Sequence, residues 1–303
     1  VEQSKEKVLS TEKNIELVDA KENKIVIPAG FKITGDATTV DKGIVIEDAT
    51  VDKDGKPTAT AGSQFVWVPV GKITKADGTE TTITLGRYNF DYSTGVGSAY
   101  SGDWVEEDTN ASSKLTNIEG KSIAKNITNF KNSVTANGGY YIGRYEARTT
   151  TPRNDIGNDL TQITEKGTDQ VYNYVTQQQA AEQAQEMYTS NNFTSDLMNS
   201  YAWDTAILFI QKCTGNVKYS YQTCLNESLS QTGTENDKQC NIYDMASNVC
   251  EWTTETPGNN CGSSPCVYRG GHCDDSYAST CNRGTRGASY SHICIGFRPL
   301  LYL

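Results

Sequence analysis

The order of hydrophobic patterns along this 303-residue chain constrains its fold more than any other feature. Short apolar runs rich in β-branched residues come first, in "KIVIPAGFKIT" (24–34), "GIVIEDATV" (43–51), "SQFVWVPVGKI" (63–73) and "GGYYIGRYEA" (138–147). Runs of this kind, broken by glycine, proline and aspartate, are typical of short strands joined by turns. No helical pattern separates the first three, so a repeating βαβ architecture is not expected.

Two helical patterns follow. Residues 177–188, "QQQAAEQAQEMY", are mostly strong helix formers. Residues 194–213 carry a wide apolar face, and Thr194 or Ser195 is suited to cap the start of that helix. After about residue 240 the sequence returns to short strands and many turns. Strands, then two helices, then loop-rich strands indicate an α+β fold.

Charge and hydropathy exclude several classes of partner. The net charge is −10 and no basic patch is present, so no nucleic-acid partner is expected. No apolar run approaches the length of a bilayer span, so this chain is not expected to insert into a membrane. Its polar first residues, "VEQSKEKVLSTEKN", indicate that a targeting segment is absent from the given chain.

The nine cysteines all fall between Cys213 and Cys294. An odd number leaves at least one thiol unpaired within a single chain. Cys261 and Cys266, in "CGSSPC", are close enough in sequence to close a small disulfide, which would indicate export. Free buried thiols are the other interpretation, and the sequence leaves both open.

The C-terminal half carries ordered motifs. "NIYDMASNVCEWTTE" (241–255) is similar to a "YDMAGNVWEW" signature, and "YRGG" (268–271) and "GFRP" (296–299) follow in matching order. With "FVWVPVG" and "YYIGRYEA" upstream, the chain resembles the formylglycine-generating enzyme, or sulfatase-modifying factor, family over residues 61–303. The resemblance implies a C-type-lectin-like domain there, with two helices, short twisted sheets and long loops. A β-rich leader or display segment, residues 1–60, would precede it.

The resembling superfamily holds enzymes and binding proteins. Its oxidases bind copper through two thiolates in a pattern like "CHDSYCNRYR", and its sulfoxide synthases bind iron through histidines. Here "CDDSYASTCNRGTR" places Cys273 and Cys281 further apart than in the oxidases, and no histidine precedes His272. An enzyme is therefore not expected, although an oxidase of this type stays as an alternative. The binding branch includes variable proteins of diversity-generating retroelements, in which adenine-directed mutagenesis rewrites a C-terminal cassette.

Residues 272–295, called the insert below, have the composition that such mutagenesis leaves. The insert contains no Lys, Glu, Gln, Met or Trp. Every residue type present can be reached from an asparagine codon by changing its two adenines, whereas Lys, Glu, Gln, Met and Trp cannot. The brackets on either side, Arg269–Gly271 and Gly296–Pro299, match the family motifs. The pattern favours a variable surface within a fixed frame that includes Trp252 and Arg269.

Randomised positions cannot lie in a close-packed core, so the insert is expected to form one exposed patch. Gly270, Gly271 and Gly296 should hold its ends in tight geometry, and either Ile293 or Ile295 should turn inward. Tyrosine with small polar residues is typical of binding surfaces. The candidate ligand-binding residues are His272, Cys273, Asp274, Asp275, Tyr277, Thr280, Cys281, Thr285, Tyr290, His292 and Cys294.

Two metal hypotheses remain open. The resemblance implies a calcium ion held by Glu251 and by the residues at Asn248 and Val249, through oxygen ligands. Ser247 and Cys250 depart from the family there, which has glycine and tryptophan at these positions. A metal held by His272 or His292 together with cysteines is the second hypothesis.

The sequence as a whole therefore predicts a bacterial or phage binding or adhesion protein, extracellular or at a cell surface. Its partner would be a protein or glycan. Leaders similar to "IPAGFKI" (27–33) occur in relatives with a pilin-like apolar N-terminus, which implies an anchor missing from the given chain. The alternatives are the copper and cysteine oxidase and a structural pilus or surface subunit without a specific ligand.

Overall fold

The computed structural model describes residues 1–107, 120–149, 153, 166–167, 170–224, 228–233 and 237–303. Within these residues the chain has a mixed α+β fold, as the sequence predicts. None of the helices described is both long and apolar enough to cross a membrane. The described helices are α1 (Ile127–Asn137), α2 (Gln177–Glu186) and α3 (Ser200–Thr214).

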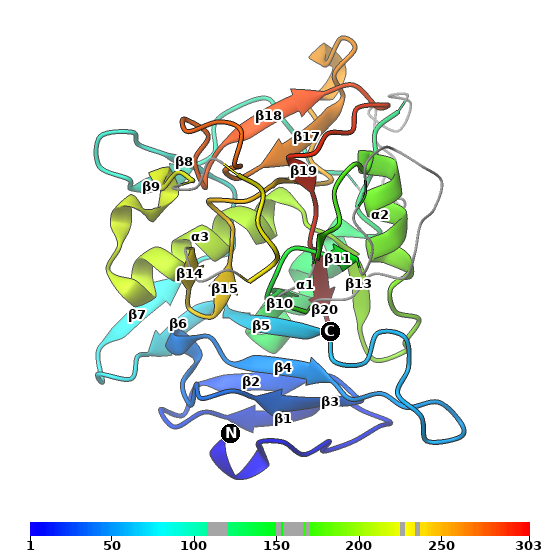
Figure 1. Ribbon diagram of the computed structural model, residues 1–303. Coiled ribbons are helices and arrows are strands. Elements are labelled where there is room, and N and C mark those ends of the chain that lie inside the picture. Colours follow the sequence, from blue (N-terminus) through cyan, green and yellow to red (C-terminus); the bar gives the residue numbers. More distant parts are fainter. Residues whose placement is uncertain (108–119, 150–152, 154–165, 168–169, 225–227, 234–236) are drawn as a thin grey trace.

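A six-stranded sheet forms the centre of the molecule (Figure 1). The final strand of the chain, β20 (Pro299–Tyr302), lies inside this sheet, between β13 (Thr194–Leu197) and β10 (Gly139–Gly143). The N-terminal strands β3 (Phe31–Thr34) and β4 (Val45–Asp48) join the same sheet because β4 pairs with β5 (Gln64–Pro69). The first 60 residues therefore share a sheet with the rest of the chain. The strand order is β13 (Thr194–Leu197), β20 (Pro299–Tyr302), β10 (Gly139–Gly143), β5 (Gln64–Pro69), β4 (Val45–Asp48) and β3 (Phe31–Thr34).

A four-stranded sheet lies at the opposite end of the molecule from the N-terminal strands (Figure 1). Its order is β18 (Arg283–Arg286), β17 (Cys266–Arg269), β16 (Cys250–Trp252) and β19 (Ile295–Gly296). The insert runs from β17 to β19 and contributes β18. Two-stranded sheets complete the described strands: β1 (Ile15–Val18) with β2 (Lys24–Ile27), β6 (Gly71–Thr74) with β7 (Glu80–Ile83), β8 (Tyr88–Phe90) with β9 (Gly97–Ala99), β11 (Arg148–Thr149) with β12 (Gln170–Val171), and β14 (Lys238–Gln239) with β15 (Ile242–Tyr243).

The helix predictions were right in kind and partly wrong in extent. Helix α2 begins where expected, and the Thr176 side chain caps it. The long helix was predicted to start at residue 194, but α3 starts at Ser200 with Asn199 as its cap. Residues 194–197 instead form β13, because this segment pairs with β20 across the sheet. Helix α1 was not predicted from the sequence.

Arginines from both closing motifs are buried beside carboxylates. Arg298 of "GFRP" is fully buried and contacts Glu251 with Nη2–Oε1 at 2.6 Å. Arg269 of "YRGG" is equally buried and contacts Asp204 at 2.5 Å. Trp252 is also fully buried, and its Nε1 donates to Val175 O at 2.7 Å. Trp252 and Arg269, the two residues expected to belong to the frame, are thus both buried in the core.

Candidate functional site

Two glycines fix the start of the insert. Gly270 has a φ of 88°, and a Cβ there would lie 2.7 Å from Met245 O. A Cβ on Gly271 would lie only 2.0 Å from Ala246 O. At the other end Gly296 packs against Val249, and Ile295 is buried while Ile293 is 38% exposed. The structure confirms that the glycines at both ends of the insert lie in tight surroundings, and that only Ile295 of the two isoleucines is buried.

The first part of the insert is a turn with an exposed tip. The side chain of Asp275 accepts a hydrogen bond from Tyr277 N at 2.8 Å, which holds the turn. Tyr277 is 91% exposed, and Asp274 and Asp275 are exposed beside it. Thr280, by contrast, is fully buried, and its backbone N–H donates to Gln222 O at 3.0 Å. The expectation that Thr280 points outward is wrong, because this end of the turn packs against the segment around residues 220–223.

The eleven candidates differ in exposure, so the expectation that the insert forms one exposed patch is wrong. Asp274, Asp275 and Tyr277 are exposed, whereas Cys273, Thr280 and Cys294 are buried. The others lie half-buried along the surface of the insert: His272, Cys281, Thr285, Tyr290 and His292.

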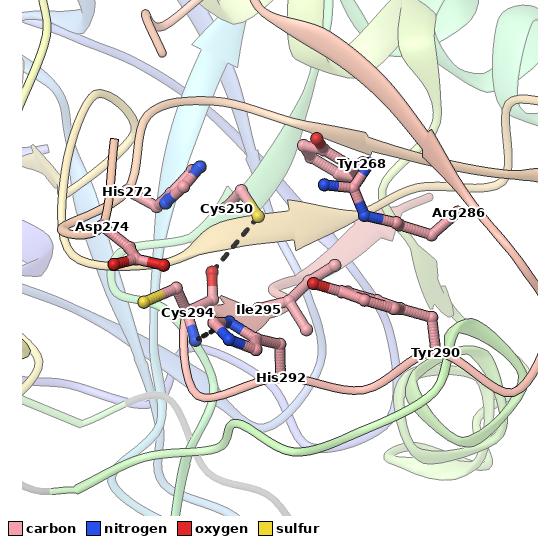
Figure 2. Close-up of a pocket in the computed structure, with 9 residues that line it drawn as sticks. All are labelled: Cys250, Tyr268, His272, Asp274, Arg286, Tyr290, His292, Cys294 and Ile295. Carbon is pink, nitrogen blue, oxygen red and sulfur yellow. Dashed lines mark hydrogen bonds between the residues drawn. The ribbon is translucent and has the colours of Figure 1, made fainter. Parts of the chain in front are cut away.

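A small pocket of about 140 Å³ opens between the turn and the last part of the insert (Figure 2). It brings five of the sequence-predicted residues together and leaves Cys273, Asp275, Tyr277, Thr280, Cys281 and Thr285 outside its lining. The lining residues are Cys250, Tyr268, His272, Asp274, Arg286, Tyr290, His292, Cys294 and Ile295.

One wall of the pocket is aromatic and cationic. The Arg286 guanidinium lies 5.3 Å from the ring centroid of Tyr268 and 5.1 Å from that of Tyr290. Tyr290 also stacks on His292, at 6.1 Å between centroids, and meets the edge of Trp252. Hydrogen bonding to Tyr290 raises the pKa of Arg286, so this wall carries a positive charge. Stacked arginine and tyrosine side chains offer a ligand both flat apolar area and hydrogen-bond donors.

The opposite wall is rich in sulfur. The Sγ atoms of Cys273 and Cys294 are 3.3 Å apart, and Cys250 Sγ donates to Cys294 O at 3.2 Å. The contact between the two thiols lowers the pKa of Cys273 and raises the pKa of Cys294, so Cys273 loses its proton before Cys294 does. Burial raises the pKa of Cys250 well above its usual range.

The sulfur arrangement differs from the oxidase pattern. Cys273 contacts Cys294, whereas Cys281 Sγ lies 3.6 Å from Ser279 Oγ. The motif cysteines Cys273 and Cys281 are thus not paired with each other. Cys261 and Cys266 are free thiols, which matches the second of the two interpretations left open for that loop.

The residues suggested for calcium do not fit that ion. The Glu251 carboxylate is fully buried and receives the Arg298 guanidinium through both of its oxygens, at 2.6 to 3.1 Å. Asn248 donates through Nδ2 to Glu146 Oε2 at 2.6 Å, and its Oδ1 accepts from Ser230 N. A divalent cation beside Glu251 would meet the positive charge of Arg298, so the carboxylate on which the site depends is already committed.

Several residues of the site were missed by sequence reasoning. Cys250, Tyr268, Arg286 and Ile295 line the pocket but were not named as candidates. Cys250 did carry a signal, because it stands where the resembling family has tryptophan, and a smaller side chain there leaves space. Arg283 was also missed as a structural residue within the insert, where it contacts Asp204 at 2.5 Å.

A wider groove of about 700 Å³ lies elsewhere, between the N-terminal segment and residues 187–193. Its lining consists of threonines, small residues and a few apolar or aromatic side chains, without an acid, a lysine, an arginine, a histidine or a cysteine. This groove therefore lacks the acids, histidines and thiols that line the pocket at the insert.

Comparisons with known proteins give weak structural matches. No family model and no curated protein matches the sequence. The fold is similar to PvdO from Pseudomonas aeruginosa, with a TM-score of 0.44 and 13% identity, covering 84% of this chain and 98% of that chain. It is also similar to Treponema denticola variable protein 1, with a TM-score of 0.39 and 12% identity, covering 82% of this chain and 99% of the other. Neither likeness identifies an activity, so the proposal below rests on the residues of the site.

Proposed function

We propose that this chain is a non-catalytic binding protein, secreted or displayed at a cell or phage surface, whose insert is a sequence-diversified ligand-binding surface. One observation carries the proposal. The exposed tip at Asp274–Tyr277 and most of the pocket wall come from the single stretch whose residue types match adenine-substituted asparagine codons. Trp252 and Arg269, which contact that stretch at Tyr290 and Asn282, lie outside it and are buried.

We further propose that residues 61–303 have a C-type-lectin-like fold of the formylglycine-generating kind. The placement of the motifs supports this assignment. "FVWVPVG" begins within β5, "YYIGRYEA" begins within β10, and "GFRP" leads into β20. These three strands are neighbours in the central sheet, although the motifs are far apart in sequence.

The chemistry of the insert suits a large partner, a protein or a glycan. A pocket of about 140 Å³ is smaller than the several hundred Å³ that a drug-sized ligand typically occupies. Most contact would therefore come from the surface around it, where Tyr277 supplies rigid area and Asp274 and Asp275 accept hydrogen bonds. A few such side chains commonly dominate the affinity of an interface.

Binding to a glycan array and to a panel of cell-surface proteins tests the function. The wild-type chain is compared with Tyr277→Ala and with Tyr92→Ala, whose tyrosine is 80% exposed but lies outside the insert. We expect at least one ligand for the wild type, retained by Tyr92→Ala and lost or weakened by at least about tenfold in Tyr277→Ala. A wild-type chain that binds nothing, or binding that both substitutions weaken equally, would contradict the proposal.

A further inference from the structure

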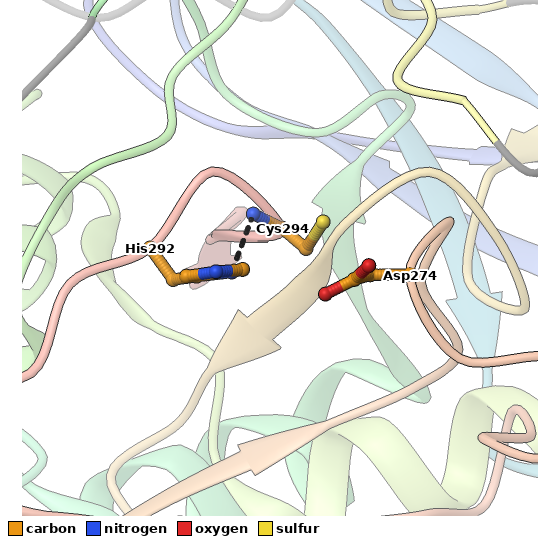
Figure 3. Close-up of side chains that lie close together, drawn as sticks. All are labelled: Asp274, His292 and Cys294. Atoms are coloured by element: carbon orange, nitrogen blue, oxygen red, sulfur yellow. Dashed lines mark hydrogen bonds between the residues drawn. The ribbon is translucent and has the colours of Figure 1, made fainter.

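Asp274, His292 and Cys294 bring three different kinds of metal ligand together at the mouth of the pocket (Figure 3). One ligand atom of each residue lies within 4.8 Å of the corresponding atoms of the other two. Asp274 comes from the first turn of the insert, while His292 and Cys294 come from its last segment. The fold, not the sequence spacing, therefore creates this cluster.

A fourth ligand lies next to the cluster. Cys273 Sγ is 3.3 Å from Cys294 Sγ. Around a tetrahedral ion with bonds of about 2.0–2.3 Å, neighbouring ligand atoms are separated by roughly 3.3–3.8 Å. Two thiolates on such an ion would be about 3.8 Å apart, so the two sulfurs need to separate by about 0.5 Å, while the carboxylate and imidazole need a shift of about 1 Å.

The chemical types of the four ligands indicate which class of metal ion the cluster would bind. Two sulfurs, an imidazole and a carboxylate are the ligands of zinc and similar first-row ions, whereas calcium and magnesium require oxygen alone. Cys294 N donates to His292 Nδ1 at 3.3 Å, so this nitrogen presents a lone pair toward the Cys294 end of the cluster. Because that hydrogen bond is long, an ion can replace it at small cost.

A second observation in the same pocket is independent of the cluster. Nδ1 of His272 is buried and has no hydrogen-bond partner among the described residues. Buried polar atoms are normally satisfied, so an isolated one calls for a partner. The Arg286 charge lies between Tyr268 and Tyr290, on the far side of the pocket from Asp274 (Figure 2).

We propose that Asp274, His292, Cys294 and Cys273 bind one zinc-class transition-metal ion, with His272 beside it. Binding would displace the thiol protons to solvent and tie the first turn of the insert to its last segment. The ion would thereby order the pocket mouth. The metal site does not depend on the proposed function, because metal binding can be measured without any protein or glycan partner of the insert.

Cobalt(II) and zinc(II) titrations of the whole chain test the site. The protein is reduced with a phosphine, stripped of metal with a chelator and titrated with each ion alone. We expect one ion per chain and, for cobalt, the near-ultraviolet charge-transfer band that only thiolate ligands produce. Cys294→Ser should weaken the band, because Cys273 remains as the only thiolate ligand, and should weaken binding by more than about 100-fold, since even outer partners of a metal site are worth 10–100-fold.

Matched variants separate the site from adventitious binding. His292→Gln and Asp274→Asn should weaken zinc binding, whereas Asp275→Asn and Cys261→Ser, which change the neighbouring carboxylate and a distant thiol, should not. His292 is half-buried, so His292→Gln remains informative if Cys294→Ser does not fold. The proposal is overturned if the reduced protein shows no stoichiometric binding, if binding survives in Cys294→Ser, or if Cys273 and Cys294 form a disulfide that persists under the reductant.

Discussion

Replacing either of two arginines on β18 by alanine should lower the free energy of unfolding, but by very different amounts. Arg283 and Arg286 lie three residues apart on one strand, and both belong to the insert. The Arg283 side chain is 13% exposed and contacts two fully buried carboxylates, Asp204 and Glu255. Arg286 is exposed and lies over two tyrosine rings. Arg→Ala at each position removes the same side chain from the same kind of backbone.

The magnitude for Arg283→Ala follows from the hydrogen bonds and ion pairs that the substitution removes. Arg283 donates to Asp204 Oδ2 at 2.5 Å, to both oxygens of Glu255 at 3.1 and 3.3 Å, and to Tyr88 O at 3.0 Å. Hydrogen bonds to charged groups contribute about 1.5–3 kcal/mol each but are not additive. Breaking a buried ion pair outright costs about 3–5 kcal/mol. Arg269 still contacts Asp204 and Arg87 still contacts Glu255, so the loss should fall near the lower limit, at about 3 kcal/mol.

Arg286→Ala should cost less than about 1 kcal/mol, because an exposed cation over an aromatic ring contributes about 0.5–1 kcal/mol. Urea unfolding of the two variants and the wild type, followed by circular dichroism, gives both free energies. Equal losses of stability would refute the view that Arg283 supports the fold whereas Arg286 belongs to the exposed binding surface. A loss below about 1 kcal/mol for Arg283→Ala would refute it as well.

Three further outcomes are expected. Trp252→Ala should lower the free energy of unfolding by about 3–5 kcal/mol, as large aromatic truncations in cores do, whereas Tyr277→Ala should change it by less than about 0.5 kcal/mol; similar losses in urea would place the tip of the insert in the core. Burial raises the pKa of Asp196 to about 6. The folded state then binds more protons than the unfolded state between about pH 4 and 6, so Asp196 should cost up to about 3 kcal/mol of stability as pH rises through that window. Unfolding of Asp196→Asn measured across this range should lack that slope, and an unchanged slope would contradict the assignment. Incubation of the chain with copper, oxygen and a cysteine-containing sulfatase-type peptide should give no oxidation, and turnover that Cys273→Ser abolishes would favour the oxidase instead.

The local sequence pattern predicted an element correctly where the rest of the fold does not override that pattern. "KIVIPAGFKIT" predicts two strands around a turn, and β2 and β3 flank Pro28–Gly30 as expected. The start of the long helix was misread because residues 194–197 pair with β20, more than a hundred residues later in the chain. A polar strand fixed by such a distant partner carries no local signal.

The sequence indicated where the candidate site lies, but not which of its residues are buried or which of them meet. Residue types alone marked the insert, since composition can be recognised without knowledge of packing. Burial of Thr280 depends on the segment around Gln222, and the approach of Cys294 to Cys273 depends on how two ends of the insert meet. Pairings of this kind arise only when the chain folds, and no spacing in the sequence encodes them.

The central claim, that the insert is rewritten while its frame is kept, is tested most directly by sequencing this gene and its flanks from many isolates. We expect differences concentrated in the codons for the exposed positions, 274–277 above all, at adenines of a near-copy next to a reverse transcriptase gene. The codons for the buried Arg269, Arg283 and Arg298 should be unchanged. Differences spread evenly over residues 61–303, or an insert that is identical in every isolate without a near-copy nearby, would contradict the account.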